Sequence, residues 1–301
     1  MSVVQRPGDG PEDELSSTEV ISGPTVLRIL LGGQLRKLRE AAGITPDRAG
    51  YEIRASRSKI SRVEHGRVSF KERDVADLLS LYGVADAEER AALLNLAREA
   101  NTPGWWHAYS DVLSAWLEPY VGLEAAASVI RTYQIQFVPG LLQTEAYARA
   151  LIRQGAAASD EEIARRSELR ASRQEILRRP GAPQLWVLVD EGALRRPVGS
   201  REIVREQLKY LAEMAEHPAV TLQILPFATG AHPAMGGAFT ILRFAEPDVA
   251  DVVYIEQLTR ALYLEKSAEV DSYLEIMSQL CLRAESAANT GKLLQQILSD
   301  V

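Results

Sequence analysis

Apolar residues recur at helical spacing in several short segments between residues 25 and 100. Leu35, Leu38 and Ala42 fall at positions i, i+3 and i+7, which form one face of an amphipathic helix, and Gly43 then ends that helix. The same kind of pattern predicts further helices over 46–53, after Ser56, over 70–81 and over 87–100. Five helices in so short a stretch indicate one small all-α domain.

The second and third of these helices carry clear start signals. Thr45 stands where an N-cap is expected, and Pro46 follows at the first helical position, where its missing N–H costs nothing. Ser56 caps the next helix, in which Ile60 and Val63 face the core. The spacing leaves only a tight turn between the two helices.

The outward face of the helix after Ser56 is basic and rich in hydroxyl groups. The side chains expected on it are Arg57, Ser58, Lys59, Ser61 and Arg62. Arginine, lysine and helix N-terminal amides hold phosphates, whereas arginine and serine can reach base edges in the major groove. We therefore predict a DNA-binding face, with Thr45 and Lys59 near phosphates. The alternative is an ordinary helical hairpin whose charged face is only solvated.

Residues 25–84 resemble a helix-turn-helix domain of the Xre/Cro repressor type, which has a five-helix, lambda-repressor-like fold. Its recognition helix often reads S-x-S-x-I-S-R-x-E-x-G, and the matching positions are Ser56, Ser58, Ile60, Ser61, Arg62, Glu64 and Gly66. The resemblance implies that Arg57, Ser58 and Arg62 read bases. The expected DNA-binding set is thus Thr45, Ser56, Arg57, Ser58, Lys59 and Arg62.

The same resemblance implies a structural ion pair. The family pairs an arginine four residues before the turn glycine with a glutamate near the end of the recognition helix, and here these positions are Arg39 and Glu64. Such a partly buried pair orients helices and does not touch DNA. One position departs from the pattern. Pro46 stands where many members have a glutamine that contacts the DNA backbone, and proline has no side-chain donor.

The charge of the chain is unevenly distributed. The whole chain of 301 residues has a formal charge of −7, which argues against a protein that coats nucleic acid with its entire surface. Residues 25–84 hold 12 basic and 7 acidic residues, a net of +5, and the remainder holds 22 and 34, a net of −12. A basic module on an acidic body fits local contact with double-stranded DNA.

Composition and the N-terminal sequence exclude several classes. Cys281 is the single cysteine, which excludes a disulfide framework and a cysteine metal site. Residues 1–22 read as a disordered leader, without the apolar run of a signal peptide. No apolar run reaches the ~18 residues of a membrane span. We expect a cytoplasmic protein without membrane contact.

The character of the chain changes after residue 100. We predict a helix-turn-helix domain over 23–100 and an α+β regulatory or interaction domain over 101–301, so the chain is multidomain. Helices are expected over 118–129, 141–152, 161–179, 201–216 and 268–298. Strands are expected over 185–190, 220–226, 239–244 and 252–256, with no regular βαβ period.

Two features of the C-terminal part can be interpreted either as structural or as functional. Trp105, Trp106, Tyr109 and Trp116 favour a core or domain interface over a stacking platform for bases or ligands. The helix over 161–179 carries six arginines, and a face that pairs with acidic surroundings is favoured over a second DNA-binding surface.

The C-terminal part also resembles a large family of actinobacterial regulators, described as WhiJ-like and antitoxin-like. The segments that carry the resemblance are 118–120 with 123–124, Val138–Thr144 with Tyr147–Arg149, 190–191 with 194–199, Leu225–Phe227 and Val253–Glu256. The resemblance implies an Xre helix-turn-helix followed by this domain, and a small partner protein encoded nearby. It implies no chemistry for the domain.

No residues support an enzyme. The four histidines are scattered without His or Cys company at i+3 or i+4, so we expect no metal and no cofactor. Cys281 lies in an apolar helical stretch that favours a buried, inert thiol. Asp190 and Glu191 would point to opposite faces if the strand continued. The loop Gly230–Gly237 could approach a small ligand, but a plain hairpin connection explains it equally well. No catalytic residue is assigned.

These observations predict a sequence-specific transcriptional regulator whose C-terminal domain binds a partner protein or an effector. The alternative is an antitoxin-like module that mainly sequesters a small partner protein. A single helix-turn-helix contacts few base pairs, so we expect a homodimer on an inverted repeat. The interface is expected after residue 101, in the tryptophans, the strand over 252–256 and the terminal helix with Leu293, Leu294, Ile297 and Leu298.

Overall fold

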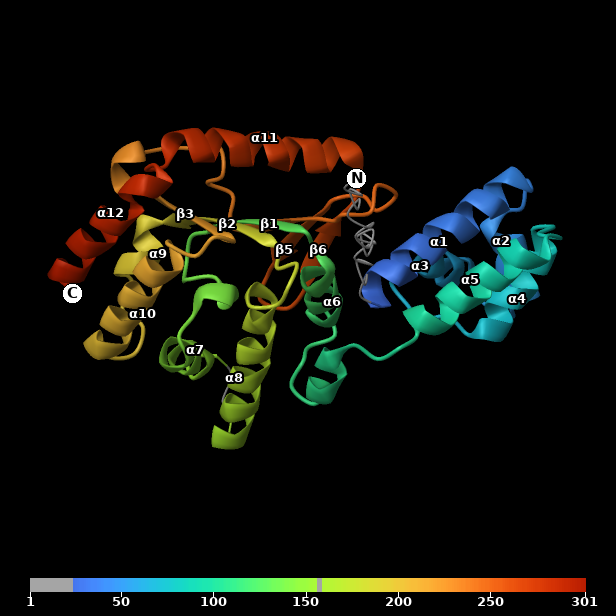
Figure 1. Cartoon of the computed structure of the whole chain (residues 1–301), viewed down its shortest axis with the longest axis horizontal. Coiled ribbons are helices and arrows are strands. Elements are labelled where there is room, and N and C mark those ends of the chain that lie inside the picture. Colours follow the sequence, from blue (N-terminus) through green and yellow to red (C-terminus); the bar gives the residue numbers. More distant parts are fainter. Residues whose placement is uncertain (1–23, 156–158) are drawn as a thin grey trace, which may run out of the picture.

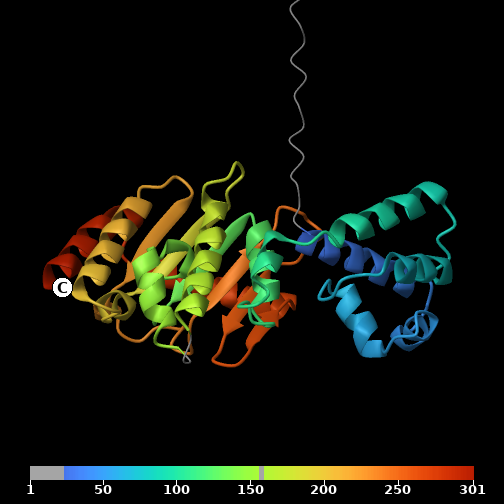
Figure 2. The same ribbon diagram turned by 90° about the horizontal axis from the view of Figure 1, so that it is seen from below.

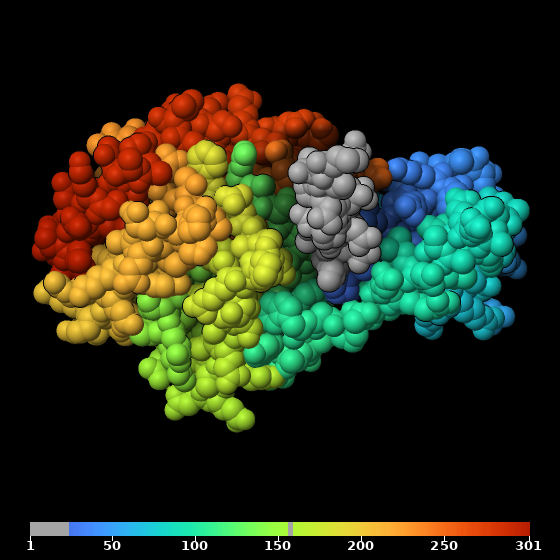
Figure 3. All heavy atoms as spheres, in the orientation of Figure 1, coloured from blue at the N-terminus to red at the C-terminus, as the bar shows by residue number. Residues whose placement is uncertain are grey.

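The computed structural model describes residues 24–155 and 159–301, and the leader predicted over 1–22 lies outside them. The described chain forms two lobes that lie side by side along the long axis of the molecule (Figures 1 and 3). The smaller lobe is all-helical and holds the N-terminal part. The larger lobe is built around a β-sheet, and the segment after the fifth helix runs between the two (Figure 2). The predicted combination of an all-α and an α+β part is confirmed.

The described residues 24–100 form five α-helices, as predicted. They are α1 (Pro24–Ala41), α2 (Pro46–Glu52), α3 (Arg57–Glu64), α4 (Glu72–Leu81) and α5 (Ala87–Ala100). Thr45, Ser56 and Asp86 each accept a backbone N–H from the residue three positions on, which satisfies a donor that the first helical turn leaves free. The core contains the expected apolar stripes, including Leu35, Ala49, Ile53, Ile60, Val63, Val75, Leu78, Leu79, Leu93 and Ala97.

The described part of the larger lobe holds a mixed sheet of six strands in the order β3-β2-β1-β4-β5-β6. The strands are β1 (Val129–Gln134), β2 (Gln184–Asp190), β3 (Val220–Leu225), β4 (Phe239–Arg243), β5 (Val252–Glu256) and β6 (Ala261–Leu264). Strands β1, β2 and β3 pair in parallel, and β4, β5 and β6 continue the sheet antiparallel. The helices are α6 (Glu118–Ala126), α7 (Glu145–Ile152), α8 (Asp160–Gln174), α9 (Glu191–Arg195), α10 (Arg201–Met214), α11 (Ser267–Arg283) and α12 (Ala287–Asp300).

Four features of this lobe differ from what the sequence predicts. The parallel half is a βαβαβ unit, although the sequence suggested no βαβ period. Its first strand, β1, was missed because Arg131, Thr132 and Gln134 interrupt the apolar run, and β6 was missed as well. The helical stretch expected over 268–298 is divided into two helices, α11 and α12. The chain is extended at Ala284, which ends α11. The N–H of Glu285 then donates to the carbonyl of Ile224 on β3, whereas in a continuing helix it would have donated to a carbonyl of the helix itself.

Helices cover the two faces of the sheet unequally (Figure 1). One face packs against α6, α7, α8, α10 and α12, and its core includes Ile130, Val187, Leu208, Leu222 and Leu294. The other face is covered by α11, whose Val270, Met277 and Leu280 contact Tyr133, Leu188, Phe239 and Val253. One long helix is narrower than a six-stranded sheet, so part of this second face has no helix above it.

Helix α1 belongs to both lobes. Val26, near its start, is part of the core beneath the sheet, whereas Leu31 and Leu35 are part of the helix-turn-helix core. Thr25 and Trp106 lie against Gly122 of α6, and a Cβ at Gly122 would lie 2.1 Å from Thr25 Oγ1. Trp106 is buried, as the interface reading of the aromatic cluster predicts, but Trp105 and Trp116 are more than one third exposed.

The apolar residues named as a dimer surface are largely used inside the lobe. Val252, Val253 and Tyr254 are buried in the sheet, and Leu294 and Ile297 are buried against it. Leu293 and Leu298 pack against the same core. These residues were expected to be spare surface because the sequence does not show that β5 lies between β4 and β6. These residues therefore give no support to the prediction that the dimer interface lies after residue 101.

Candidate nucleic-acid interface

The recognition helix α3 is anchored on one side and free on the other. Ile60 and Val63 are buried, which fixes the rotation of the helix about its axis. The side chain of Ser56 accepts from the N–H of Lys59 at 3.2 Å. With that rotation, Ser56, Arg57, Ser58, Ser61 and Arg62 are exposed on the opposite side. The N-terminal turn of α3 therefore presents a basic, hydroxyl-rich surface of the kind that enters a DNA groove.

The turn between α2 and α3 places the two helices close together. The N–H of Ala55 donates to the carbonyl of Gly50 at 2.8 Å. A Cβ at Gly50 would lie 2.7 Å from the oxygen of Ala55, so a larger residue would push the turn away. Arg54 completes the turn with a φ of +53°, the single positive value found at a non-glycine residue in the described chain. L-residues rarely adopt this conformation, so the turn stores strain at Arg54.

Helix α3 also packs unusually close to α1. A Cβ at Gly32 would lie 2.5 Å from the carbonyl oxygen of Val63, and one at Gly66 would lie 2.6 Å from the backbone nitrogen of Ile29. Gly66 has a φ of +63°, which a glycine adopts without steric cost. Both glycines let the C-terminal end of α3 rest directly on the backbone of α1.

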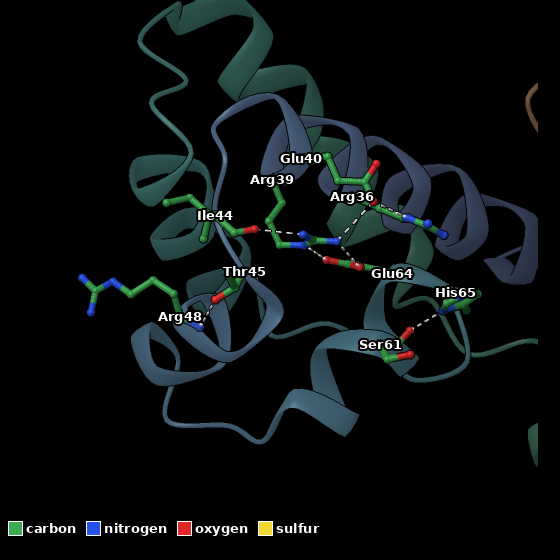
Figure 4. A network of polar contacts seen from close by, with 9 residues as sticks. All are labelled: Arg36, Arg39, Glu40, Ile44, Thr45, Arg48, Ser61, Glu64 and His65. Carbon is green, nitrogen blue, oxygen red and sulfur yellow. Dashed lines mark hydrogen bonds and ion pairs between the residues drawn. The ribbon is translucent and has the colours of Figure 1, made fainter.

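Arg39 and Glu64 join α1 to α3 beside this contact (Figure 4). Arg39 Nε donates to Glu64 Oε1 at 2.5 Å and Nη2 donates to Oε2 at 3.1 Å. Nη1 of the same guanidinium donates to the carbonyl of Ile44 in the turn before α2. Both charged side chains are more than 90% buried, and the hydrogen bonds that Arg39 donates to Glu64 raise the pKa of Arg39. The bidentate pair thus positions the turn, α1 and α3 together.

Two of the predicted DNA-contacting cations already have acidic neighbours. Lys59 Nζ lies 3.1 Å from Asp74 Oδ2 of α4, and both side chains are partly buried. Arg57 Nη1 lies 3.8 Å from Asp47 Oδ2 of α2, and both of these side chains are about 70% exposed. An exposed pair at that distance is weak, so Arg57 can leave Asp47 for DNA. Lys59 would have to give up a closer and more shielded carboxylate.

The geometry adds a residue pair that the sequence reading did not select. Tyr51 on α2 is 76% exposed, and the guanidinium of Arg48 lies 5.5 Å from the centre of its ring. Arg48 is the residue whose N–H binds the Thr45 cap. Both side chains are therefore on the exposed surface of α2. The signal in the sequence was the spacing of three between Arg48 and Tyr51, which puts them on one helix face.

The arginines of 161–179 pair with their surroundings, as the favoured reading predicts. Arg173 makes a bidentate contact with buried Glu124 at 2.8 Å. Arg165 contacts Asp111 and Glu168, Arg166 contacts Glu162, and Arg178 contacts Glu175. Arg170 donates to Gln143 Oε1, and burial lowers the pKa of its guanidinium to about 10. A second DNA-binding face gains no support here.

The carboxylates considered for catalysis hold the backbone in place. Strand β2 ends at Asp190 and does not continue through Glu191, and Asp190 caps α9 by accepting the N–H of Gly192 at 2.8 Å. Glu191 accepts from Arg195 Nε at 2.6 Å and from the N–H of Phe227 at 2.8 Å. In the loop over 230–237, His232 lies 3.2 Å from the hydroxyl of Tyr133.

Among the described helices, none combines the length and apolar character needed to cross a membrane.

Two domain families match this chain. A helix-turn-helix domain family matches residues 30–93, and a family described as a domain of unknown function, DUF5753, matches residues 117–296. No curated protein and no solved structure matches the chain. The first match covers α2, α3 and the Arg39–Glu64 pair. The second covers the sheet and more than half of the chain, which therefore belongs to the DUF5753 family and has a helix-turn-helix domain in front of that domain.

Proposed function

We propose that this protein is a sequence-specific transcriptional regulator that binds double-stranded DNA in the cytoplasm. The observation that carries the proposal is the exposed N-terminal turn of α3, with Arg57, Ser58 and Arg62 facing solvent on a helix whose rotation is fixed by Ile60 and Val63. The helix-turn-helix family match supports DNA binding. The assignment to the Xre-type, WhiJ-like regulators is part of this proposal, and it is supported by the resemblance of the sequence to that family.

Selection of bound sites from random DNA, followed by gel shifts at one stated salt concentration, tests the proposal. We expect one enriched sequence, and weaker discrimination at one base pair for Arg57→Ala. Arg205→Ala is a matched control, because this exposed arginine lies on α10 in the other lobe. Equal binding of selected and random DNA by the intact protein would refute sequence-specific regulation.

We also propose that the protein binds DNA as a homodimer. The reason is the size of one helix-turn-helix, which reads few base pairs, so that two half-sites about 34–36 Å apart are needed. Light scattering of the full-length chain at micromolar concentration tests this, and selected sites should be inverted repeats. The full chain is needed because residues 101–301 alone would lack Val26 and Thr25, which complete the larger lobe. A monomer on a single half-site would contradict the proposal.

A role as an antitoxin-like module that binds a small partner protein is the second candidate. The observation in its favour is that three exposed apolar side chains lie on the C-terminal part of α11 and on the loop that contacts Arg283 of this helix. Phe227, Met235 and Leu282 are 61–87% exposed. The loop with Phe227 and Met235 is tied to the end of α11 through Arg283, which donates to the carbonyl of Ala231. Exposed apolar side chains that gather in this way are typical of protein-binding surfaces.

Co-purification of the full-length chain with the product of a small neighbouring gene tests this second role. Leu282→Ser should weaken the complex without changing DNA binding, because Leu282 lies on α11 and not in the helix-turn-helix domain. Leu258→Ser is a matched control, since Leu258 is 99% exposed but lies in the turn between β5 and β6. Capture that is equally strong with both variants would remove this surface as the binding site.

A further inference from the structure

A groove runs beside α11 on the sheet face that this helix only partly covers. It is lined by Arg131, Trp186 and Gln223 from β1, β2 and β3, and by Met277, Ser278, Cys281 and Leu282 from α11. Its volume is about 510 Å³, which lies within the range of small-molecule sites. The lining is mainly apolar with few polar groups, which is also typical of such sites.

Arg131 is the cation among the residues that line this groove. It lies in the middle of β1, a central strand, and is partly buried. Within residues 24–155 and 159–301, no carboxylate forms an ion pair with it. The neighbouring sheet arginine, Arg243 of β4, is by contrast held by Asp251 at 2.9 Å. A partly buried guanidinium that forms no ion pair keeps donors free for a bound anion.

The aromatic surface next to Arg131 is held rigidly. The guanidinium of Arg131 lies 5.6 Å from the centre of the Trp186 ring. Trp186 Nε1 donates to Gln223 Oε1 at 2.9 Å, and Gln223 Nε2 donates to the carbonyls of Cys281 and Glu285. Both amide N–H groups of Gln223 are thus used in joining the sheet to the end of α11. Gln223 fixes the ring and leaves Arg131 as the donor for a bound molecule.

The hydroxyl and the thiol in the groove are less suited to bind an anion. Ser278 donates its proton to the carbonyl of Leu274 at 2.8 Å, so it has only its lone pairs to offer. Burial raises the pKa of the Cys281 thiol, and the positive charge of Arg131 opposes this. A negative group would meet the guanidinium, and an apolar body would meet Met277 and Leu282.

We propose that this groove binds a small organic anion, a carboxylate on a flat apolar body, through Arg131 and the fixed ring of Trp186. Arg131 recognises the carboxylate, because a guanidinium can donate two parallel hydrogen bonds to it. Trp186 and the α11 side chains contact the apolar body. The proposed binding is argued from the residues of the groove and does not depend on the proposed function. Its use as an effector site of the DNA-binding protein rests on the proposed function.

Calorimetric titration of the full-length chain with 2-naphthoate, and with neutral 2-naphthamide, tests the proposal. The wild-type protein should bind one naphthoate saturably and at least about tenfold more tightly than the amide, as expected for a hydrogen-bonded charge. Arg131→Gln should lose that preference, whereas Arg260→Gln, in the exposed turn before β6, should keep it. Trp186→Leu should weaken the binding of both molecules.

The titration can overturn the binding proposal without affecting the proposed DNA-binding function. No saturable binding of naphthoate at millimolar concentration, or equal affinity of wild-type protein for the acid and the amide, would overturn the proposal. The wild-type comparison needs no variant, so a poorly folded Arg131→Gln protein would not obscure the result. Because the titration contains no DNA, its failure leaves the proposed regulator intact. A failure of site selection would likewise leave the groove untouched.

Discussion

Val26 and Leu35 lie on the same helix and are both fully buried, yet they belong to different cores. Val26 packs beneath the sheet of the larger lobe, and Leu35 packs against the recognition helix. Two exposed ion pairs join the lobes as well, Lys37 with Asp248 and Arg67 with Glu265, and such pairs contribute little. Helix α1 is thus the main apolar connection between the DUF5753 domain and the helix-turn-helix domain.

Val26→Ala should therefore destabilise the larger lobe, although its position lies on the first helix of the smaller one. Loss of a fully buried valine costs about 1–3 kcal/mol. Hydrogen exchange should show faster exchange in α6 and β1 than in α4. Val63→Ala is the matched control, because Val63 is buried in the helix-turn-helix core, and it should produce the reverse pattern. Equal effects of both variants on α4 would mean that α1 does not divide its packing in this way.

Arg39→Ala should be among the most damaging single substitutions in the smaller lobe. It leaves the carboxylate of Glu64 buried without its partner, which costs about 3–5 kcal/mol. The double variant Arg39→Met with Glu64→Leu removes both charges and should regain most of that stability. Urea denaturation followed by circular dichroism measures both. If the double variant is no more stable than the single one, the uncompensated charge is not the source of the loss.

Arg54→Gly should make the helix-turn-helix domain more stable by up to about 1 kcal/mol. The strained φ of +53° at Arg54 costs about 1–2 kcal/mol for an L-residue, and the extra chain entropy of glycine offsets part of the gain. Gly50→Ala should have the opposite sign, because its Cβ would meet the carbonyl oxygen of Ala55 at 2.7 Å. Thermal unfolding of both variants is the measurement, and a destabilised Arg54→Gly protein would contradict the strain at this turn.

Arg57→Ala should relax specificity at its base pair by about 1–3 kcal/mol, since an arginine that reads a base contributes to discrimination. Binding to mismatched sites should change little. Competition gel shifts with single-base variants of the selected site give the comparison. A uniform loss on all sequences would instead place Arg57 on a phosphate.

Lys59→Ala should weaken binding to all sequences alike and reduce the slope of affinity against salt by about 1. The ion pair with Asp74 provides a sharper form of this experiment. Asp74→Asn removes the carboxylate that holds the Lys59 ammonium and should therefore strengthen binding to every sequence. Unchanged affinity in both variants would show that Lys59 is a structural residue of the α3–α4 contact.

The helix-turn-helix could be predicted from sequence because its signals are local. Capping hydroxyls at Thr45 and Ser56 and apolar positions such as Ile60 act within one or two helical turns, so their meaning does not depend on distant residues. The Arg39–Glu64 pair came from a family resemblance. The strain at Arg54 and the close contact of Gly32 with α3 were not predicted, since each depends on how two helices meet in space.

What the sequence by itself determined is the presence and type of most elements, the α+β class and the basic surface of α3. The tertiary structure decided the rest. Strand β1 exists because β2 and β4 pair with its backbone on either side, and pairing across more than 50 residues leaves no local pattern. In the same way, Arg131 looks like any surface arginine in the sequence. It becomes an unpaired cation in a groove only because parallel pairing sets it beside Trp186 and α11 lies across the strands.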